Sequence, residues 1–126
     1  MKWLFILLTI VAPGGPASGC DFGGEEMVRA ELLFGRTAVP AAEWDYFLSR
    51  TVTPLFPDGM TVLDGNGQWR SPKSGSISRE ASTVLLILVK PASDLRARLD
   101  AVRETYKSRF HQQSVGLVTS VSCVAF

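Results

Sequence analysis

Residues 83–89 (TVLLILV) form a run that contains no charged side chain and consists almost entirely of aliphatic residues. Such a composition favours a β-strand, and the run lies within a longer predicted strand from Ile77 to Lys90. At a sheet edge this segment would pair with other chains, so we place it at the centre of a sheet. Both of its faces must then be covered, one by helices and the other by a further layer.

Three other segments are predicted to be strands. Residues 28–34 alternate, with Val28, Ala30, Leu32 and Phe34 on one face. Residues 60–63 form a second strand, which a turn at 64–67 (DGNG) ends before residues 68–70 run back briefly. Residues 114–126 alternate again. We therefore expect four strands, counting the long one.

Two segments have helical spacing. One opens at residues 37–40, carries Trp44 and Phe47 on one side and closes before Pro54 and Pro57. The other begins near Ser93, a predicted N-cap, and has an apolar stripe: Leu95, Leu99, Val102, Tyr106 and Phe110. The order strand, helix, strand, strand, helix, strand predicts an α+β, ferredoxin-like βαββαβ sandwich, in which a four-stranded antiparallel sheet carries both helices on one face.

The first residues predict export. Lys2 precedes an apolar run at residues 3–12, which is too short to span a bilayer as a helix. A Pro/Gly cluster and small residues then lead to Cys20. We expect residues 1–19 to be a signal peptide, 20–27 a tether and 28–126 a single domain. The mature protein would then be either a membrane-anchored lipoprotein of the cell envelope or a periplasmic or secreted protein.

Cys20 has two possible fates. The small residues before it resemble a bacterial lipobox, which implies lipidation of Cys20 and a membrane anchor, although Ala17 stands where leucine is usual. The alternative is ordinary cleavage, with Cys20 free or bonded to Cys123, because an exported chain meets an oxidising compartment. If it is not so bonded, Cys123 is expected to be a buried thiol.

The composition excludes several function classes. Thirteen basic and 12 acidic residues give no basic excess for nucleic acid. Two cysteines and one histidine do not suggest a structural zinc site. Since there is no P-loop or Gly-x-Gly-x-x-Gly motif, we expect no nucleotide, and no cofactor or metal is predicted.

Three segments together resemble a bacterial family of small exported proteins known as domain of unknown function 3574. They are residues 31–36 (ELLFGR), residues 53–62 running on to 67–70 (GQWR), and residues 106–115 with Gln112-Gln113-Ser114. Arg79-Glu80 lies between them. The resemblance implies an intact domain and export, and it implies no catalytic residue because the family has no established activity.

Four residues are candidate ligand-binding residues: Arg36, Asp58, Trp69 and Arg70. Trp69 and Arg70 offer an aromatic plate and a guanidinium for a carboxylate, sugar or phosphate, and Arg36 is a second guanidinium that can converge with Arg70. Structural explanations stand beside these: Asp58 lies in a Pro-Asp-Gly turn, and Arg79-Glu80 suits an ion pair across strands. His111, the sole histidine, lacks a nucleophile motif to serve and is given no role.

The second face of the long strand predicts a partner. Its aliphatic residues would be buried if a second copy packed sheet to sheet, so we expect a homodimer; the alternative cover is the tether or the loop at 71–75. Arg29, Glu31, Ser120 and Ser122 are expected on this face. The chain is thus interpreted as a non-catalytic module that binds a small ligand or a protein. The alternative is a cofactor-independent enzyme with its cavity between two such sheets.

Overall fold

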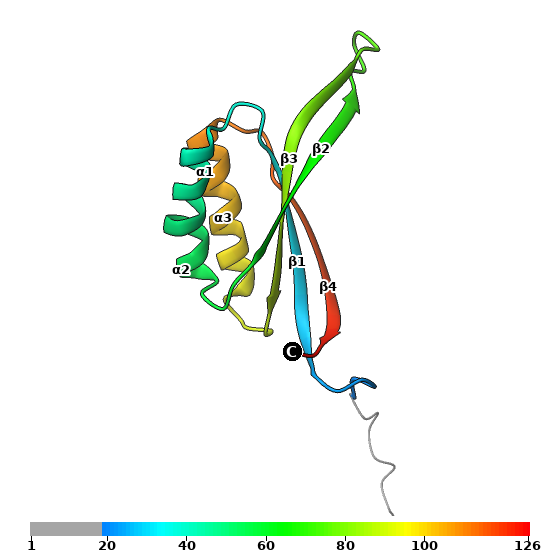
Figure 1. The fold of residues 1–126 in the computed structure, drawn as a ribbon, viewed down its shortest axis with the longest axis vertical. Coiled ribbons are helices and arrows are strands. Elements are labelled where there is room, and N and C mark those ends of the chain that lie inside the picture. The colour runs from blue at the N-terminus through cyan, green and yellow to red at the C-terminus, as the bar shows by residue number, and fades with distance from the viewer. Residues whose placement is uncertain (1–18) are drawn as a thin grey trace, which may run out of the picture.

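The computed structural model describes residues 19–126, so residues 1–18 of the predicted signal peptide lie outside the described residues. The chain forms a four-stranded sheet with all of its helices on one face (Figure 1). The strands are β1 (Glu25–Gly35), β2 (Thr61–Arg70), β3 (Ile77–Val89) and β4 (Gly116–Val124). The helical elements are α1 (Ala41–Phe47), the π-helix η1 (Leu48–Val52), α2 (Thr53–Leu55) and α3 (Leu95–Phe110).

The strands lie in the order β2-β3-β1-β4, and every neighbouring pair is antiparallel. This order and the helix placement are those of a ferredoxin-like fold, which confirms the predicted fold class. The apolar strand β3 lies between β2 and β1, as its composition predicted. The strand β1 starts three residues earlier than expected, because residues 25–27 pair with β4, and the predicted tether is shorter by that length.

The core lies between the sheet and the helices. The predicted alternation of β1 is confirmed, since Ala30, Leu32 and Phe34 are buried there. Facing them, α1 contributes Trp44 and Phe47, and α3 contributes its predicted stripe. Phe34 lies edge-on to Tyr106 with ring centroids 4.6 Å apart, which anchors the end of β1 to the C-terminal half of α3.

The predicted turn at residues 64–67 is wrong. Each of these residues pairs with β3, from Asp64 opposite Thr83 to Gly67 opposite Glu80, so β2 continues unbroken to Arg70. Thr83 donates a 2.8 Å hydrogen bond to Asp64, which holds this residue in the strand. The reversal instead occurs at residues 71–76, where Gly75 has a φ of +72°.

The start of α3 also differs from the prediction. The helix begins at Leu95, preceded by Asp94 rather than capped by Ser93, and no side chain caps its first turn. Its end is unusual, because His111 takes the left-handed conformation with a φ of 53°. The predicted end of the chain differs as well, since β4 covers Gly116–Val124 rather than residues 114–126.

The strands β2 and β3 extend beyond the helices (Figure 1). The pairing of β1 with β3 ends at Gly35 opposite Ser82, and beyond this point β2 and β3 pair only with each other. We call residues 66–81 the arm. We call the sheet face away from the helices the open face; the register places these side chains on it: Arg29, Glu31, Leu33, Leu63, Trp69, Glu80, Val84, Leu86, Leu88, Val118, Ser120 and Ser122.

Candidate functional site

A groove of about 690 Å³ lies on the open face at the base of the arm. Segments that are far apart in the sequence line it: the end of β1, both strands of the arm, and the connection from α3 to β4. We call it the Trp69–Glu80 groove, and its lining residues are these: Leu33, Gly35, Trp69, Glu80, His111, Gln112, Gln113, Ser114 and Gly116.

Gly35 makes room for two polar side chains in the groove. A Cβ added to this residue would lie 3.6 Å from Oε1 of Gln112 and 4.0 Å from Oε1 of Glu80. A larger side chain at position 35 would therefore fill the space between these two oxygens. The second carboxylate oxygen of Glu80 accepts a 3.2 Å hydrogen bond from the hydroxyl of Thr37, and the amide nitrogen of Gln112 donates to the carbonyl of Phe110 at 3.3 Å. Both side chains keep an oxygen acceptor for a ligand.

Trp69 forms the opposite wall of the groove. Gly67 pairs with Glu80, and Trp69 lies two residues further along β2. Since side chains alternate between the two faces of a strand, the indole and the carboxylate lie on the same face of the arm. Trp69 is 52% exposed, although tryptophan, the largest side chain, is mostly buried in proteins. The glycines at positions 65 and 67 carry no side chain beside it. About half of this residue's surface is thus accessible to a ligand.

The third wall of the groove is the segment 112–114, and His111, whose backbone is in the left-handed conformation, positions it. This residue ends α3 and sends residues 112–114 back toward the sheet, with the backbone N–H of Gln112 donating to Lys107 at 3.0 Å. A non-glycine residue in this conformation is strained, and such strain is concentrated at functional sites. His111 thus ends α3 and also lines the groove.

The charge of the groove is negative. Glu80 carries the one formal charge among the residues that line it, and no lysine or arginine is among them. Uncharged donors and acceptors surround it on Gln112, Gln113 and Ser114. An aromatic face beside a carboxylate favours an organic cation over an anion.

A second cluster surrounds Arg36 on the other side of the sheet. Its guanidinium stacks on Trp44, with its carbon 4.1 Å from the ring centroid, and donates to Thr83 at 3.1 Å. Thr83 in turn donates to Asp64, and the Nε of Arg36 is buried without a partner. Arg36 and Asp64 line a cavity of about 380 Å³. Thr83 links the positive charge of Arg36 to the negative charge of Asp64. A role in holding the sheet to α1 therefore accounts for the cluster, and no ligand is needed to explain it.

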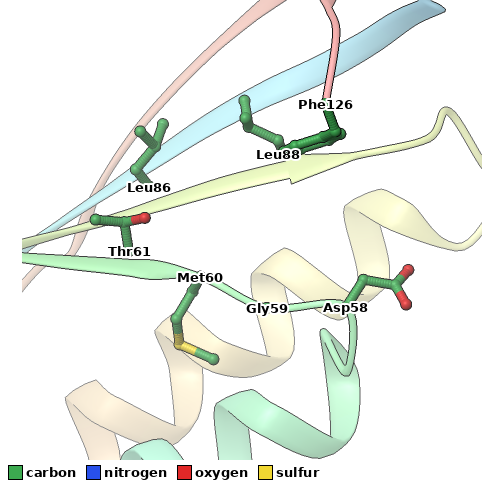
Figure 2. A pocket seen from close by; sticks show the side chains of 7 residues that line it. All are labelled: Asp58, Gly59, Met60, Thr61, Leu86, Leu88 and Phe126. Atoms are coloured by element: carbon green, nitrogen blue, oxygen red, sulfur yellow. The ribbon is translucent and has the colours of Figure 1, made fainter.

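The four predicted ligand-binding residues do not share one site. Trp69 lies in the groove, Arg36 lines the cavity behind the sheet, and Arg70 donates from its Nε to the carbonyl of Gly75 at 3.2 Å. Asp58 borders a separate pocket of about 250 Å³, where its side chain points away from Leu86 and Leu88 (Figure 2). The predicted convergence of Arg36 and Arg70 on one anion is not found.

Sequence reasoning missed most of the groove. Glu80 was expected to pair with a basic side chain across strands, but its carboxylate accepts from Thr37 instead. His111 was assigned no role. Gln112 and Gln113 were noted only within the family resemblance. That resemblance carried the usable signal, since its segments at 67–70, 79–80 and 112–114 all meet in this groove.

Cys20 forms a disulfide with Cys123 across a sequence separation of 103 residues. This is the alternative that the sequence left open, and Cys123 is exposed rather than buried. A sulfur in a disulfide cannot also carry a thioether lipid, so lipidation of Cys20 would require a different form of the protein from this one.

No helix among residues 19–126 is long and apolar enough to cross a membrane. Within the same residues, no group of three or more potential metal ligands is found.

The family model for a protein of unknown function, DUF3574, matches residues 29–126. The chain belongs to this family. The match confirms the resemblance seen in the sequence, and it includes every residue of the Trp69–Glu80 groove.

Solved structures show the same fold at low sequence identity. A phage SAM lyase in complex with S-methyl-5'-thioadenosine is similar with a TM-score of 0.55 and 15% identity, over 81% of this chain and 92% of that chain. CutA from Synechococcus elongatus is similar with a TM-score of 0.51 and 14% identity, over 77% of this chain and 78% of that one. A search of curated proteins finds no significant match. These similarities show the fold alone.

Proposed function

We propose that this chain is an exported, non-catalytic binding module whose Trp69–Glu80 groove takes a small organic cation such as an amine. The observation that supports this most is the groove itself, where an exposed indole, one carboxylate and unpaired amide oxygens come together from separate segments. Trp69 would stack on the cation, Glu80 would balance its charge, and Gln112 would accept a hydrogen bond from its N–H.

Export is part of this proposal. The apolar run at residues 3–12 and the small residues before Cys20 support cleavage near that residue. A disulfide is also typical of a chain that reaches an oxidising compartment. In the cell envelope Cys20 would either carry a lipid that anchors the module to a membrane or hold the bond to Cys123. Intact-mass spectrometry of the membrane and soluble fractions distinguishes the two forms.

The binding experiment is a titration calorimetry series with tetramethylammonium, putrescine, acetate and glucose. We expect saturable binding of one or both cations and none of acetate. Trp69→Ala and Glu80→Gln should each weaken binding at least about tenfold, because the first removes the stacking contact and the second removes the opposite charge. Tyr46→Ala is the matched control, since it removes an exposed aromatic side chain on the helix side. Binding of acetate in preference to both cations would overturn the proposal.

One observation favours an enzyme as the second candidate. Glu80 and His111, two titratable side chains, line the same groove, and both are residue types that serve as general acids or bases. The fold can carry an enzyme, as the phage SAM lyase shows, but this similarity does not assign its reaction here. Incubation with S-adenosylmethionine, followed by detection of S-methyl-5'-thioadenosine, tests one reaction directly. Turnover that His111→Gln abolishes would replace the binding module with an enzyme.

A further inference from the structure

Two oxygen acceptors of the Trp69–Glu80 groove meet above Gly35, which has no side chain. A Cβ at this position would lie 3.6 Å from Oε1 of Gln112 and 4.0 Å from Oε1 of Glu80. Among the described residues, and apart from the chain neighbours of Gly35, no other heavy atom lies within 4 Å of that point. The nearest groups around this space are therefore two acceptors. We call the space the Gly35 site.

Both oxygens are held in position and have no donor of their own. Thr37 donates to Oε2 of Glu80 at 3.2 Å, and the amide nitrogen of Gln112 donates to the carbonyl of Phe110 at 3.3 Å. Each side chain is thus fixed through its other terminal atom, and neither Oε1 atom accepts a hydrogen bond within residues 19–126. Two fixed acceptors beside one small space suit a group that carries at least two N–H donors.

Charge and size restrict this group further. No lysine or arginine lines the groove, so the carboxylate of Glu80 favours a positively charged donor over a neutral amide. A single atom at the Cβ position of Gly35 already reaches contact distance from both oxygens, so the site has room for an ammonium nitrogen. A quaternary ammonium would instead place methyl groups against both oxygens and offer them no donor, which leaves two polar atoms unpaired.

We propose that the groove binds a protonated primary amine, with its nitrogen in the Gly35 site and its carbon chain directed along the arm toward Trp69. This inference rests on the proposed function, a groove for an organic cation, and it adds which cations the groove selects. The ammonium donates one N–H to Oε1 of Glu80 and another to Oε1 of Gln112. Trp69 pairs with Ser78, two residues farther along the arm than Glu80, so the indole covers the carbon chain (Figure 1).

Gly35 is the residue that determines this selectivity. It is not among the glycines with a positive φ, so its backbone accepts alanine without strain. The added methyl group would make ordinary contacts, at 3.6 and 4.0 Å, and would occupy the position of the ammonium nitrogen. Gly35→Ala should therefore fold and lose the site.

Titration calorimetry with n-butylammonium and butyltrimethylammonium tests the selectivity, because the two cations share their charge and carbon chain and differ in their N–H donors. The wild type should bind n-butylammonium at least about tenfold more tightly, and Gly35→Ala should lose this preference. Gly65→Ala is the matched control. Gly65 lies in the same row of the open face, its added Cβ would lie 3.5 Å from the hydroxyl oxygen of Ser82, and it does not line the groove. This variant should keep the preference.

A second variant tests the other acceptor without a change at the glycine. Gln112→Met keeps the length of the side chain and removes Oε1, so n-butylammonium should bind about tenfold more weakly while butyltrimethylammonium binds as before. Circular dichroism confirms that each variant is folded. Equal affinities of the wild type for the two cations, or a preference that both Gly35→Ala and Gln112→Met retain, would overturn the Gly35 site and leave the cation groove standing. Binding of neither cation would overturn both.

Discussion

The hydroxyl of Tyr106 donates a 2.6 Å hydrogen bond to the carbonyl oxygen of Gly35, which ties the C-terminal half of α3 to the end of β1. Gly35 lines the Trp69–Glu80 groove, so this bond connects the core to the candidate site. Tyr106→Phe should lower the free energy of unfolding by about 1–3 kcal/mol, because it leaves the carbonyl without its partner. Urea unfolding measures the loss. Tyr46→Phe, at an exposed tyrosine, should change it little.

The same tyrosine predicts a loss of stability in alkaline solution. Burial raises the pKa of the Tyr106 hydroxyl, and the positive charge of Arg36 lowers it by a smaller amount. An unfolded tyrosine loses its proton near pH 10, before the folded one does. The stabilisation is therefore complete below about pH 10 and is lost as the pH rises through the higher pKa of the folded state. Unfolding between pH 8 and 11 should show a shallower decline in Tyr106→Phe, and parallel declines would contradict the assignment.

Much of the fold was predictable because it depends on patterns that are local in the sequence. The alternation in β1 and the apolar stripe of α3 each indicate one buried face. Strand β3 has apolar residues on both faces, which indicates a central position in the sheet. The turn at 64–67 failed because Asp-Gly-Asn-Gly has the composition of a turn. Pairing with β3, a long-range contact, holds it in a strand instead.

The candidate site was less predictable, because a groove depends on which segments meet. Trp69 is predicted from its type and from a turn at 64–67 that the structure does not contain, whereas Glu80 and His111 are placed at the groove only by the register of the arm and the end of α3. Asp58 and Arg70 were chosen by the same reasoning and lie elsewhere. Residue type alone does not distinguish these cases.

The strained conformation of His111 predicts a substitution that adds stability. Its φ of 53° costs a side-chain-bearing residue about 1 kcal/mol relative to glycine. His111→Gly should therefore raise the free energy of unfolding by about that amount, and thermal melting measures the gain. His111→Ala is the matched control, since alanine keeps the strain. Both variants lack the imidazole, so they should lose ligand affinity equally where the imidazole contacts the ligand. A loss of affinity in one variant alone would show that the effect comes from the backbone conformation at position 111.

Two neighbouring glycines should respond differently to the same change. Gly23 and Gly24 have φ values of 76° and 87°, so alanine is strained at either position. A Cβ on Gly23 meets open space, whereas one on Gly24 overlaps the carbonyl oxygen of Val124. Gly23→Ala should cost about 1–2 kcal/mol, and Gly24→Ala should cost more and loosen the start of β1 from β4. Equal losses in chemical unfolding would show that β4 does not approach Gly24 this closely.

The disulfide predicts that the stability depends on reductant. The bond between Cys20 and Cys123 closes a loop across 103 residues, so it restricts the unfolded chain strongly. Cys20→Ser and Cys123→Ser should each lower the free energy of unfolding by about 2–5 kcal/mol. Dithiothreitol should lower the melting temperature of the wild type and leave both variants unchanged. A wild type that does not respond would show that Cys20 is not held by Cys123, and an added lipid mass on the same sample would explain why.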